Sequence, residues 1–154
     1  MNTLRLFIKK NKEIVSYLFW GILTTIVSWG SYALCANFLM DMQDVDIGFT
    51  VWISNSFSWI CAVVFAFITN KIWVFNSYSW QRAIVIAECG KFFSSRLATG
   101  ILELIAVPLV VKIGLDQNVL GIDGGLAKII VSLAVVIINY LSSKFMVFSN
   151  KEND

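Results

Sequence analysis

Four long apolar segments, separated by short polar links, dominate the chain. They run from about Ile14 to Leu39, Phe49 to Thr69, Leu97 to Leu115 and Leu126 to Val147. A helix needs about 20 apolar residues to cross the ~30 Å hydrocarbon layer of a bilayer, whereas a membrane strand crosses in about 10 residues and alternates polar and apolar side chains. The pattern therefore predicts an all-α membrane protein with four transmembrane helices, paired as two helical hairpins.

Composition supports the membrane assignment and removes several classes of chemistry. Hydrophobic residues make up 58% of the 154 residues, charged residues only 14%, and the mean hydropathy is +0.75. Globular domains carry about 25% charged residues. The absence of histidine excludes a Ser-His-Asp triad and His-ligated metal sites, and the three cysteines show no CxxC spacing. We expect no metal, no other cofactor and no nucleic-acid partner.

The basic residues predict the orientation. Ten of the twelve belong to the N-terminal tail, the middle link and the C-terminal end, whereas the first link carries Asp41, Asp44 and Asp46 and no basic residue. Cytoplasmic segments of membrane proteins are enriched in lysine and arginine. Both termini are therefore expected in the cytoplasm, for a multi-pass protein of the plasma membrane.

Two local patterns refine this picture at the membrane surface. Trp20, Trp52, Trp73 and Trp80 lie near the expected span ends, as aromatic belt residues do. Between the second and third spans, apolar residues recur at helical spacing from Tyr78 to Lys91. This segment predicts a separate amphipathic helix along the inner leaflet, or alternatively a partly ordered loop.

The ends of the second and fourth spans resemble each other. Residues 67–75 read Phe-Ile-Thr-Asn-Lys-Ile-Trp-Val-Phe, and residues 140–148, at an offset of 73, read Tyr-Leu-Ser-Ser-Lys-Phe-Met-Val-Phe. The shared aromatic, small polar residue, lysine and Val-Phe pair indicate that the two hairpins arose by duplication in parallel orientation. The alternative is that inward-ending spans commonly finish in lysine and aromatic residues.

These residues carry a family resemblance. The segment from Ala66 to Phe75, the later Lys91-Phe92-Phe93-Ser-Ser-Arg96, Lys128, and the segment from Asn139 to Phe148 resemble the GtrA-like family. The resemblance extends from about Val15 to Phe148, and Gly21 with Thr24 and Thr25 resembles the family's opening motif. The Asn-Tyr-x-x-Ser-Lys form is similar to the branch involved in teichoic-acid and cell-wall polysaccharide glycosylation.

The resemblance implies a function as well as a fold. It implies a single four-helix transmembrane domain over residues 1–154 that moves a polyprenyl-phosphate-linked monosaccharide, of the undecaprenyl type, from the inner to the outer leaflet. It also implies cooperation with membrane glycosyltransferases. The chain departs from the family's commoner Asn-Arg form by carrying Lys71, and a point charge there replaces a bidentate guanidinium.

The polar residues of the spans suggest where the head group binds. Glu103 lies in mid-span, and Arg96, seven residues earlier, shares its helix face because seven residues complete almost two turns. Lys128 and Asn139, eleven residues apart, are aligned in the same way. Glu103 and Lys128 lie nearer the outer leaflet. We expect them to form a second polar site, called the upper station, in which they are either ion-paired or alternately engaged with the head group.

A layer in the cytoplasmic third of the membrane is expected to hold Asn70, Lys71, Arg96, Asn139 and Lys144. Phosphate and sugar binding is expected from Asn70, Lys71, Phe92, Arg96, Glu103, Lys128, Asn139 and Lys144. Packing of the repeated motifs is expected from Ala66, Val74, Phe75 and Phe148. Structural readings stay open, because span-end lysines often only anchor a helix and membrane asparagines often only join helices.

Three other functions stay in view. Asp44-Val-Asp46 resembles the acidic metal-binding motif of glycosyltransferases, although three aspartates in a short loop are usually only solvated. Small proton-coupled exporters also have four helices and a membrane carboxylate, but theirs lies in the first helix. A non-transporting accessory subunit of a glycosyltransferase is a further possibility. Four helices barely enclose a path, so we also expect a homo-oligomer, most simply a dimer.

Overall fold

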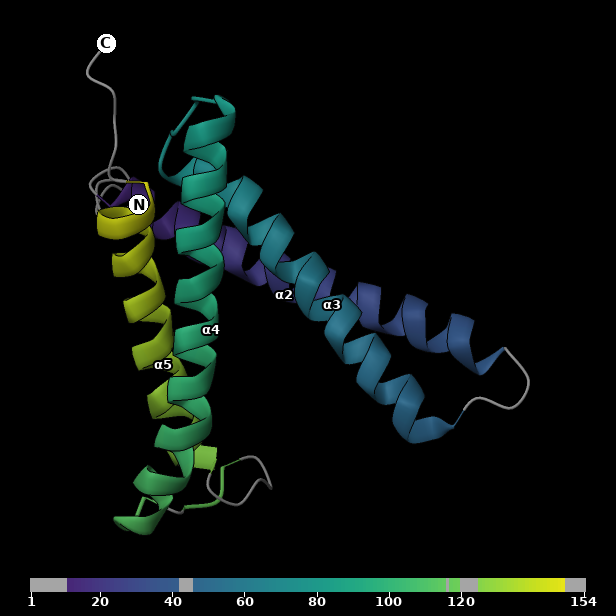
Figure 1. Ribbon diagram of the computed structural model, residues 1–154. Helices are drawn as coiled ribbons and strands as arrows, with labels where there is room; N and C mark the ends of the chain where they lie inside the picture. The colour runs from purple at the N-terminus through teal and green to yellow at the C-terminus, as the bar shows by residue number, and fades with distance from the viewer. Residues whose placement is uncertain (1–10, 42–45, 116, 120–124, 149–154) are drawn as a thin grey trace, which may run out of the picture. The chain divides into compact units, whose positions relative to one another are not determined.

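The computed structural model describes residues 11–41, 46–115, 117–119 and 125–148 and contains four long helices (Figure 1). The elements are α2 (Lys12–Met40), α3 (Ile47–Thr69) with the π-helical turn η1 (Asn70–Val74), α4 (Arg82–Lys112), and α5 (Gly125–Ser142) with the π-helical turn η2 (Ser143–Val147). All four are long and apolar enough to cross a membrane. The expected all-α architecture is confirmed, and the protein is a multi-pass membrane protein.

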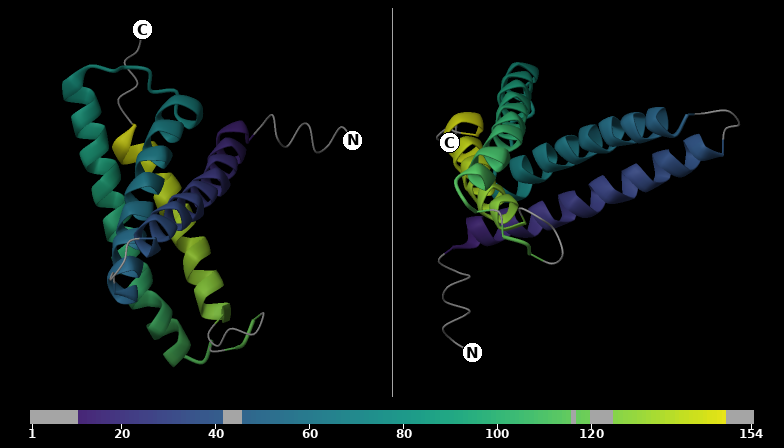
Figure 2. Two further views of the ribbon diagram at one scale, coloured as in Figure 1. Left: turned by 90° about the vertical axis from the view of Figure 1, so that its right-hand side faces the viewer. Right: turned by 90° about the horizontal axis from the view of Figure 1, so that it is seen from below.

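The chain divides into two compact units, residues 1–78 and 79–154, and each unit holds one helical hairpin (Figure 2). This division confirms the expected pairing of the spans. The single domain over the whole chain stays a prediction.

In the first hairpin, α2 packs against α3 and also contacts η1. Asp46 begins α3 as its N-cap, because its carboxylate accepts the backbone N–H of Phe49 at 3.0 Å. Thr50, Ser54 and Ser58 follow at four-residue spacing and are buried. One face of α3 is thus a row of small polar side chains, which lets neighbouring backbones approach closely.

In the second hairpin, α4 packs against α5 and η2. The buried residues of α5 also repeat every four positions, at Ala127, Val131, Val135 and Asn139. Since residues four apart share a helix face, this row defines the buried side of α5. Large apolar side chains elsewhere on the helices are exposed, as a hydrocarbon environment favours.

The separate amphipathic helix expected from Tyr78 to Lys91 is wrong. Residues 82–112 form one uninterrupted helix, so the third span is the later part of α4 and ends at Lys112 rather than near Leu115. Nothing between Lys91 and Leu97 stops a helix, since the segment contains neither proline nor glycine. At 1.5 Å per residue α4 is about 46 Å long and exceeds the ~30 Å hydrocarbon layer, so part of it lies outside that layer.

Candidate functional site

The repeated motifs adopt the same unusual conformation. Each ends its helix in a π-helical turn, closed by a hydrogen bond from the N–H of Phe75 to the carbonyl of Asn70 at 2.9 Å and from Phe148 to Ser143 at 3.0 Å. In both copies the Val-Phe pair is buried. A π-turn inserts one residue into the helical repeat and is frequent at functional sites. The resemblance between the two segments therefore extends from sequence to backbone geometry.

In the first copy the lysine is enclosed. Lys71 is fully buried, its ammonium donates to the Ser77 hydroxyl at 3.0 Å, and its carbonyl accepts the Ser77 N–H at 2.8 Å. Asn70 is also buried, and within the described residues its side-chain oxygen has no hydrogen-bond partner. A buried amide oxygen without a partner is costly, which marks this turn as a place where a further polar group would be stabilised.

Aromatic stacking attaches this turn to the first helix. The Trp73 and Trp20 rings stack with centroids 4.6 Å apart and planes 20° apart. The Ser16 hydroxyl donates to the Trp73 carbonyl at 3.2 Å. Two residues expected to act as separate belt anchors therefore contact each other, and they fix η1 against α2.

In the second hairpin an aromatic platform orients the arginine. The Arg96 guanidinium lies 4.7 Å from the centre of the Phe92 ring, and that ring lies 6.2 Å from the ring of Phe148. Phe92 is 1% exposed, so its ring is enclosed by neighbouring side chains. Lys144 is held similarly, because its ammonium donates to the Tyr140 hydroxyl at 3.2 Å and lies 5.5 Å from that ring's centre. Contact with an aromatic ring therefore positions both cations.

A polar pair links α4 to α5 above this platform. The Thr99 hydroxyl donates to the side-chain oxygen of Asn139 at 3.0 Å, and the carbonyl of Ser95 lies at the same distance as an alternative acceptor. Both Thr99 and Asn139 are buried. Because the hydroxyl has one proton and three acceptors in reach, the third being the Arg96 carbonyl at 3.2 Å, the pair can open without leaving the proton unsatisfied.

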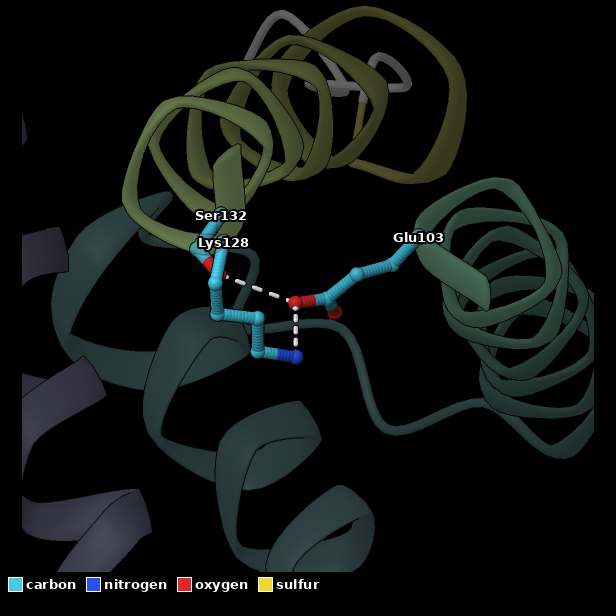
Figure 3. Close-up of polar contacts among 3 residues, drawn as sticks. All are labelled: Glu103, Lys128 and Ser132. Carbon is cyan, nitrogen blue, oxygen red and sulfur yellow. Dashed lines mark hydrogen bonds and ion pairs between the residues drawn. The ribbon is translucent and has the colours of Figure 1, made fainter. Parts of the chain in front are cut away.

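The mid-span carboxylate joins the same two helices (Figure 3). One oxygen of Glu103 accepts the Lys128 ammonium at 2.7 Å and the Ser132 hydroxyl at 2.9 Å. The Lys128 side chain remains 60% exposed and that of Glu103 26% exposed. The expected pairing of Glu103 with Lys128 is thus observed. These two contacts of the carboxylate involve the same oxygen of Glu103.

A groove of about 590 Å³ lies along the lower part of this hairpin. Hydroxyl-bearing residues dominate its polar lining, which consists of Lys91, Ser94, Ser95, Thr99 and Ser142. Such a groove has the size of a small-molecule site. Most of the lining surface is apolar, and Ser94 and Ser95 lie on the helix segment that also carries Arg96.

The candidate residues are distributed over both hairpins. The second holds Phe92, Arg96, Glu103, Lys128, Asn139, Lys144 and Phe148, and the first holds Ala66, Asn70, Lys71, Val74 and Phe75. The joint layer of Asn70 and Lys71 with the second-hairpin cations stays a prediction. Of the acidic loop motif, Asp44 lies outside the described residues, and Asp46 caps α3. Among the described residues no group of three or more His, Cys, Asp or Glu side chains could hold a metal.

Sequence analysis missed three contributors: Ser77, Thr99 and Tyr140. Thr99 could have been found, because it follows Arg96 by three residues and precedes Glu103 by four, and therefore lies on their helix face. Tyr140 lies four residues before Lys144, which is contact spacing on a helix. Nothing in the sequence indicated that Ser77 lies beside Lys71, since their contact depends on how the chain leaves η1.

Comparison with known proteins places the chain in a family. Residues 16–148 match the GtrA/DPMS transmembrane domain. The relatives include the uncharacterized membrane protein YwcD of Bacillus subtilis, 30% identical with 90% of this chain and 98% of YwcD covered, and the cell wall teichoic acid glycosylation protein GtcA of Listeria innocua, 30% identical with 88% and 84% covered. GtcA of Listeria monocytogenes is 29% identical, with 91% and 87% covered. No solved structure matches significantly. Because the match extends through both hairpins and both π-turns, this chain belongs to the GtrA/DPMS transmembrane domain family.

Proposed function

We propose that this protein moves a polyprenyl-phosphate-linked monosaccharide from the inner to the outer leaflet, where it serves glycosylation of teichoic acid or another cell-wall polymer. In this role it is a carrier working with membrane glycosyltransferases rather than an enzyme. The names of the GtcA relatives support the link to teichoic-acid glycosylation.

The observation that carries the proposal is the row of polar groups between α4 and α5. Arg96, Thr99 and Glu103 rise along one face of α4, and Asn139, Ser132 and Lys128 meet Thr99 and Glu103 from α5. From Arg96 to Glu103 the helix rises about 10.5 Å. Moving an ionised phosphate through hydrocarbon has a high free-energy cost, whereas the apolar prenyl chain is stable in hydrocarbon. A polar row on one hairpin would therefore guide the head group while the tail remained in lipid.

The lower end of the row suits capture of the phosphate. Arg96 presents a planar guanidinium, held over Phe92, that can bind two phosphate oxygens at once. The groove beside it has a mostly apolar wall that carries Ser94, Ser95 and Ser142, and it can accept the attached sugar. Lys144 supplies a second cation at the same end of the hairpin. This end is expected to face the cytoplasm, where the lipid-linked sugar is made.

At the upper end, a phosphate would compete with Glu103 for Lys128. The carboxylate already occupies the ammonium, so the substrate can replace one anion with another without leaving Lys128 unpaired in the membrane. Glu103 keeps its bond from Ser132 during the exchange. Lys128 is thus alternately engaged, and its release on re-pairing with Glu103 favours departure of the head group.

The direct test is leaflet exchange in vesicles that contain only this protein. Labelled polyprenyl-phosphate-glucose, -galactose and -N-acetylglucosamine are incorporated, and impermeant periodate oxidises the sugars that reach the outer leaflet. The wild type is expected to expose at least one of these sugars rapidly, and Arg96→Ala is expected to abolish this exchange. Lys112→Ala, which removes a basic residue at the other end of α4, is the matched control and retains exchange.

Two results would contradict the proposal in different ways. Absence of exchange by correctly inserted wild type would favour an accessory subunit that functions only beside its glycosyltransferase. Exchange that survives in Arg96→Ala, Lys128→Ala and Asn139→Ala would mean that the head group does not follow the row between α4 and α5. In cells, the same three variants are expected to lose sugar decoration while remaining in the membrane.

A further inference from the structure

The carboxylate of Glu103 uses one of its two oxygens. Oε1 accepts the Lys128 ammonium at 2.7 Å and the Ser132 hydroxyl at 2.9 Å, and both dashed lines in Figure 3 end on this atom. The other oxygen, Oε2, accepts no hydrogen bond from the described residues. A proton can therefore be added at Oε2 without displacing the Ser132 hydroxyl from Oε1.

One ammonium balances this carboxylate. The other charged or titratable groups nearest to the pair on α4, α5 and η2 are Arg96, Lys112, Tyr140 and Lys144. By rise along the helix axis, Arg96 is about 10.5 Å from Glu103 and the others are about 13 Å or more from the pair. The charges of α4 before Arg96 are farther still. Within the described part of this hairpin, Lys128 is thus the cation that compensates Glu103 directly.

Arrival of the head group at Lys128 changes this charge balance. A monosaccharide joined to a polyprenyl chain through phosphate is a phosphodiester, which carries one negative charge and has no second acidic proton. When it replaces the carboxylate on the ammonium, two anions share one cation. Like charges that share an apolar site are not both kept ionised, and one of them holds a proton instead. The phosphodiester is too acidic to hold it, so Glu103 is the group that can.

The source of the proton follows from the same balance. A proton transferred from Lys128 would remove the positive charge that the phosphate needs, so the proton comes from water. Once protonated, Glu103 can donate its Oε2–H to a phosphate oxygen while Oε1 keeps the bond from Ser132. The phosphate then receives hydrogen bonds from both members of the former ion pair. The site is electrically neutral before the exchange and again after it.

We propose that Glu103 is a proton-binding site linked to the head group: it takes up one proton from water when the phosphodiester replaces it on Lys128, and it returns that proton when the ion pair re-forms. One O–H bond forms and breaks in each cycle, and no other covalent bond changes. The inference rests on the proposed function, because it deepens the upper station of that route. It makes the proton a second ligand of the carrier, so the head group binds more tightly as the pH falls.

The experiment detects protonation of Glu103 by infrared difference spectroscopy on nanodiscs that contain the full chain. Farnesyl phosphate glucose is perfused over the sample at neutral pH, and its binding is followed by the sugar C–O bands. The wild type is expected to gain the C=O band of a protonated carboxylic acid, which shifts in heavy water. Glu103→Gln should bind the ligand without gaining this band. Glu13→Gln, which removes an acidic residue at the start of α2, is the matched control and should gain it as the wild type does.

A second measurement does not depend on a substitution at Glu103. Arg96→Ala removes the lower phosphate site and leaves the upper station, so binding in this background reports on Lys128. Because one proton is bound with each head group, the dissociation constant is expected to rise by up to about tenfold for each unit of pH between about pH 6 and 8. Adding Glu103→Gln to the same background should remove this dependence.

Three results would overturn the inference. Binding by the wild type without the acid band would mean that Glu103 stays ionised beside the phosphate. A band that persists in Glu103→Gln would place the proton on another carboxyl group. A dissociation constant independent of pH in the Arg96→Ala background would mean that Lys128 binds the phosphate without a proton.

The leaflet-exchange assay keeps this inference distinguishable from the transport proposal. A wild type that gains the acid band on binding but does not exchange the lipid contradicts transport alone. A wild type that exchanges the lipid without gaining the band contradicts the proton linkage alone.

Discussion

Glu103 brings a negative charge into a membrane-spanning helix, and its neighbours determine what that charge can do. A charge at mid-membrane costs about 2.5–3.5 kcal/mol on insertion scales, so it needs a partner. Lys128 and Ser132 both bind the same carboxylate oxygen, at 2.7 and 2.9 Å. Removal of Lys128 alone leaves an uncompensated carboxylate, whereas removal of both charges leaves two neutral groups.

Substitutions at this pair should therefore change stability and transport independently. Lys128→Met is expected to lower the thermal midpoint of the purified protein by about 5 °C and to abolish leaflet exchange. The double variant Glu103→Gln/Lys128→Met should regain most of the midpoint but remain inactive, because no cation is left to receive the phosphate. Fluorescence-detected thermal unfolding and the exchange assay measure the two properties. An active double variant would show that the pair serves packing alone.

The sequence predicted this pair better than it predicted the hydroxyl contacts around it. Charges in apolar spans must find partners, so the helical spacing of Arg96, Glu103 and Lys128 was informative. A threonine or serine can instead bond its own helix, as Thr99 does with the Ser95 carbonyl. The spacing of Thr99 places it on the helix face of Arg96 and Glu103 but does not say which acceptor it bonds, so its contact with Asn139 became visible only in the folded hairpin.

At the scale of elements, the apolar pattern predicted four helices but not how two of them end. A run of apolar residues is equally compatible with α- and π-helical turns, so the sequence did not predict η1 and η2. The repeated Lys-x-x-Val-Phe sequence indicated only that the two helix ends are related. The apolar pattern also does not show whether a helix continues through a polar segment, which explains why a separate amphipathic helix was expected where α4 is continuous. Hydropathy falls between Lys91 and Leu97, but the backbone hydrogen bonds of α4 continue through that segment.

The two π-turns share a backbone but differ in the environment of their lysines. Lys71 is fully buried and bonded to Ser77, whereas Lys144 is partly exposed beside Tyr140. Lys71→Ala should therefore lower the thermal midpoint by about 5 °C or more, and Lys144→Ala by about 2 °C or less, because only the first leaves buried groups without their partner. Thermal unfolding of both variants in the same detergent tests this order. Equal losses would mean that the turns are energetically equivalent despite their different burial.

At the scale of the whole molecule, the distribution of charge predicts how the hairpins insert. Fusions of a fluorescent protein that matures only in the cytoplasm should fluoresce at either terminus. A cysteine placed at Asp41, in a chain whose three native cysteines are replaced by alanine, should react with an impermeant maleimide added to intact cells. A cysteine at Asn76, in the link between the hairpins, is the matched control and should react only after permeabilisation. The reverse pattern would invert the direction assigned to the polar row.

The small size of the chain leads to the last prediction, that the protein functions as a dimer. Four helices barely enclose a path for a head group of phosphate plus sugar, and a second copy would add helices around that path. Native mass spectrometry from nanodiscs is expected to show dimers. If each path needs groups from both copies, mixing Arg96→Ala chains with wild type should reduce exchange more steeply than the wild-type fraction falls. Monomers alone with full exchange, or a strictly proportional loss, would mean that one chain provides the whole path.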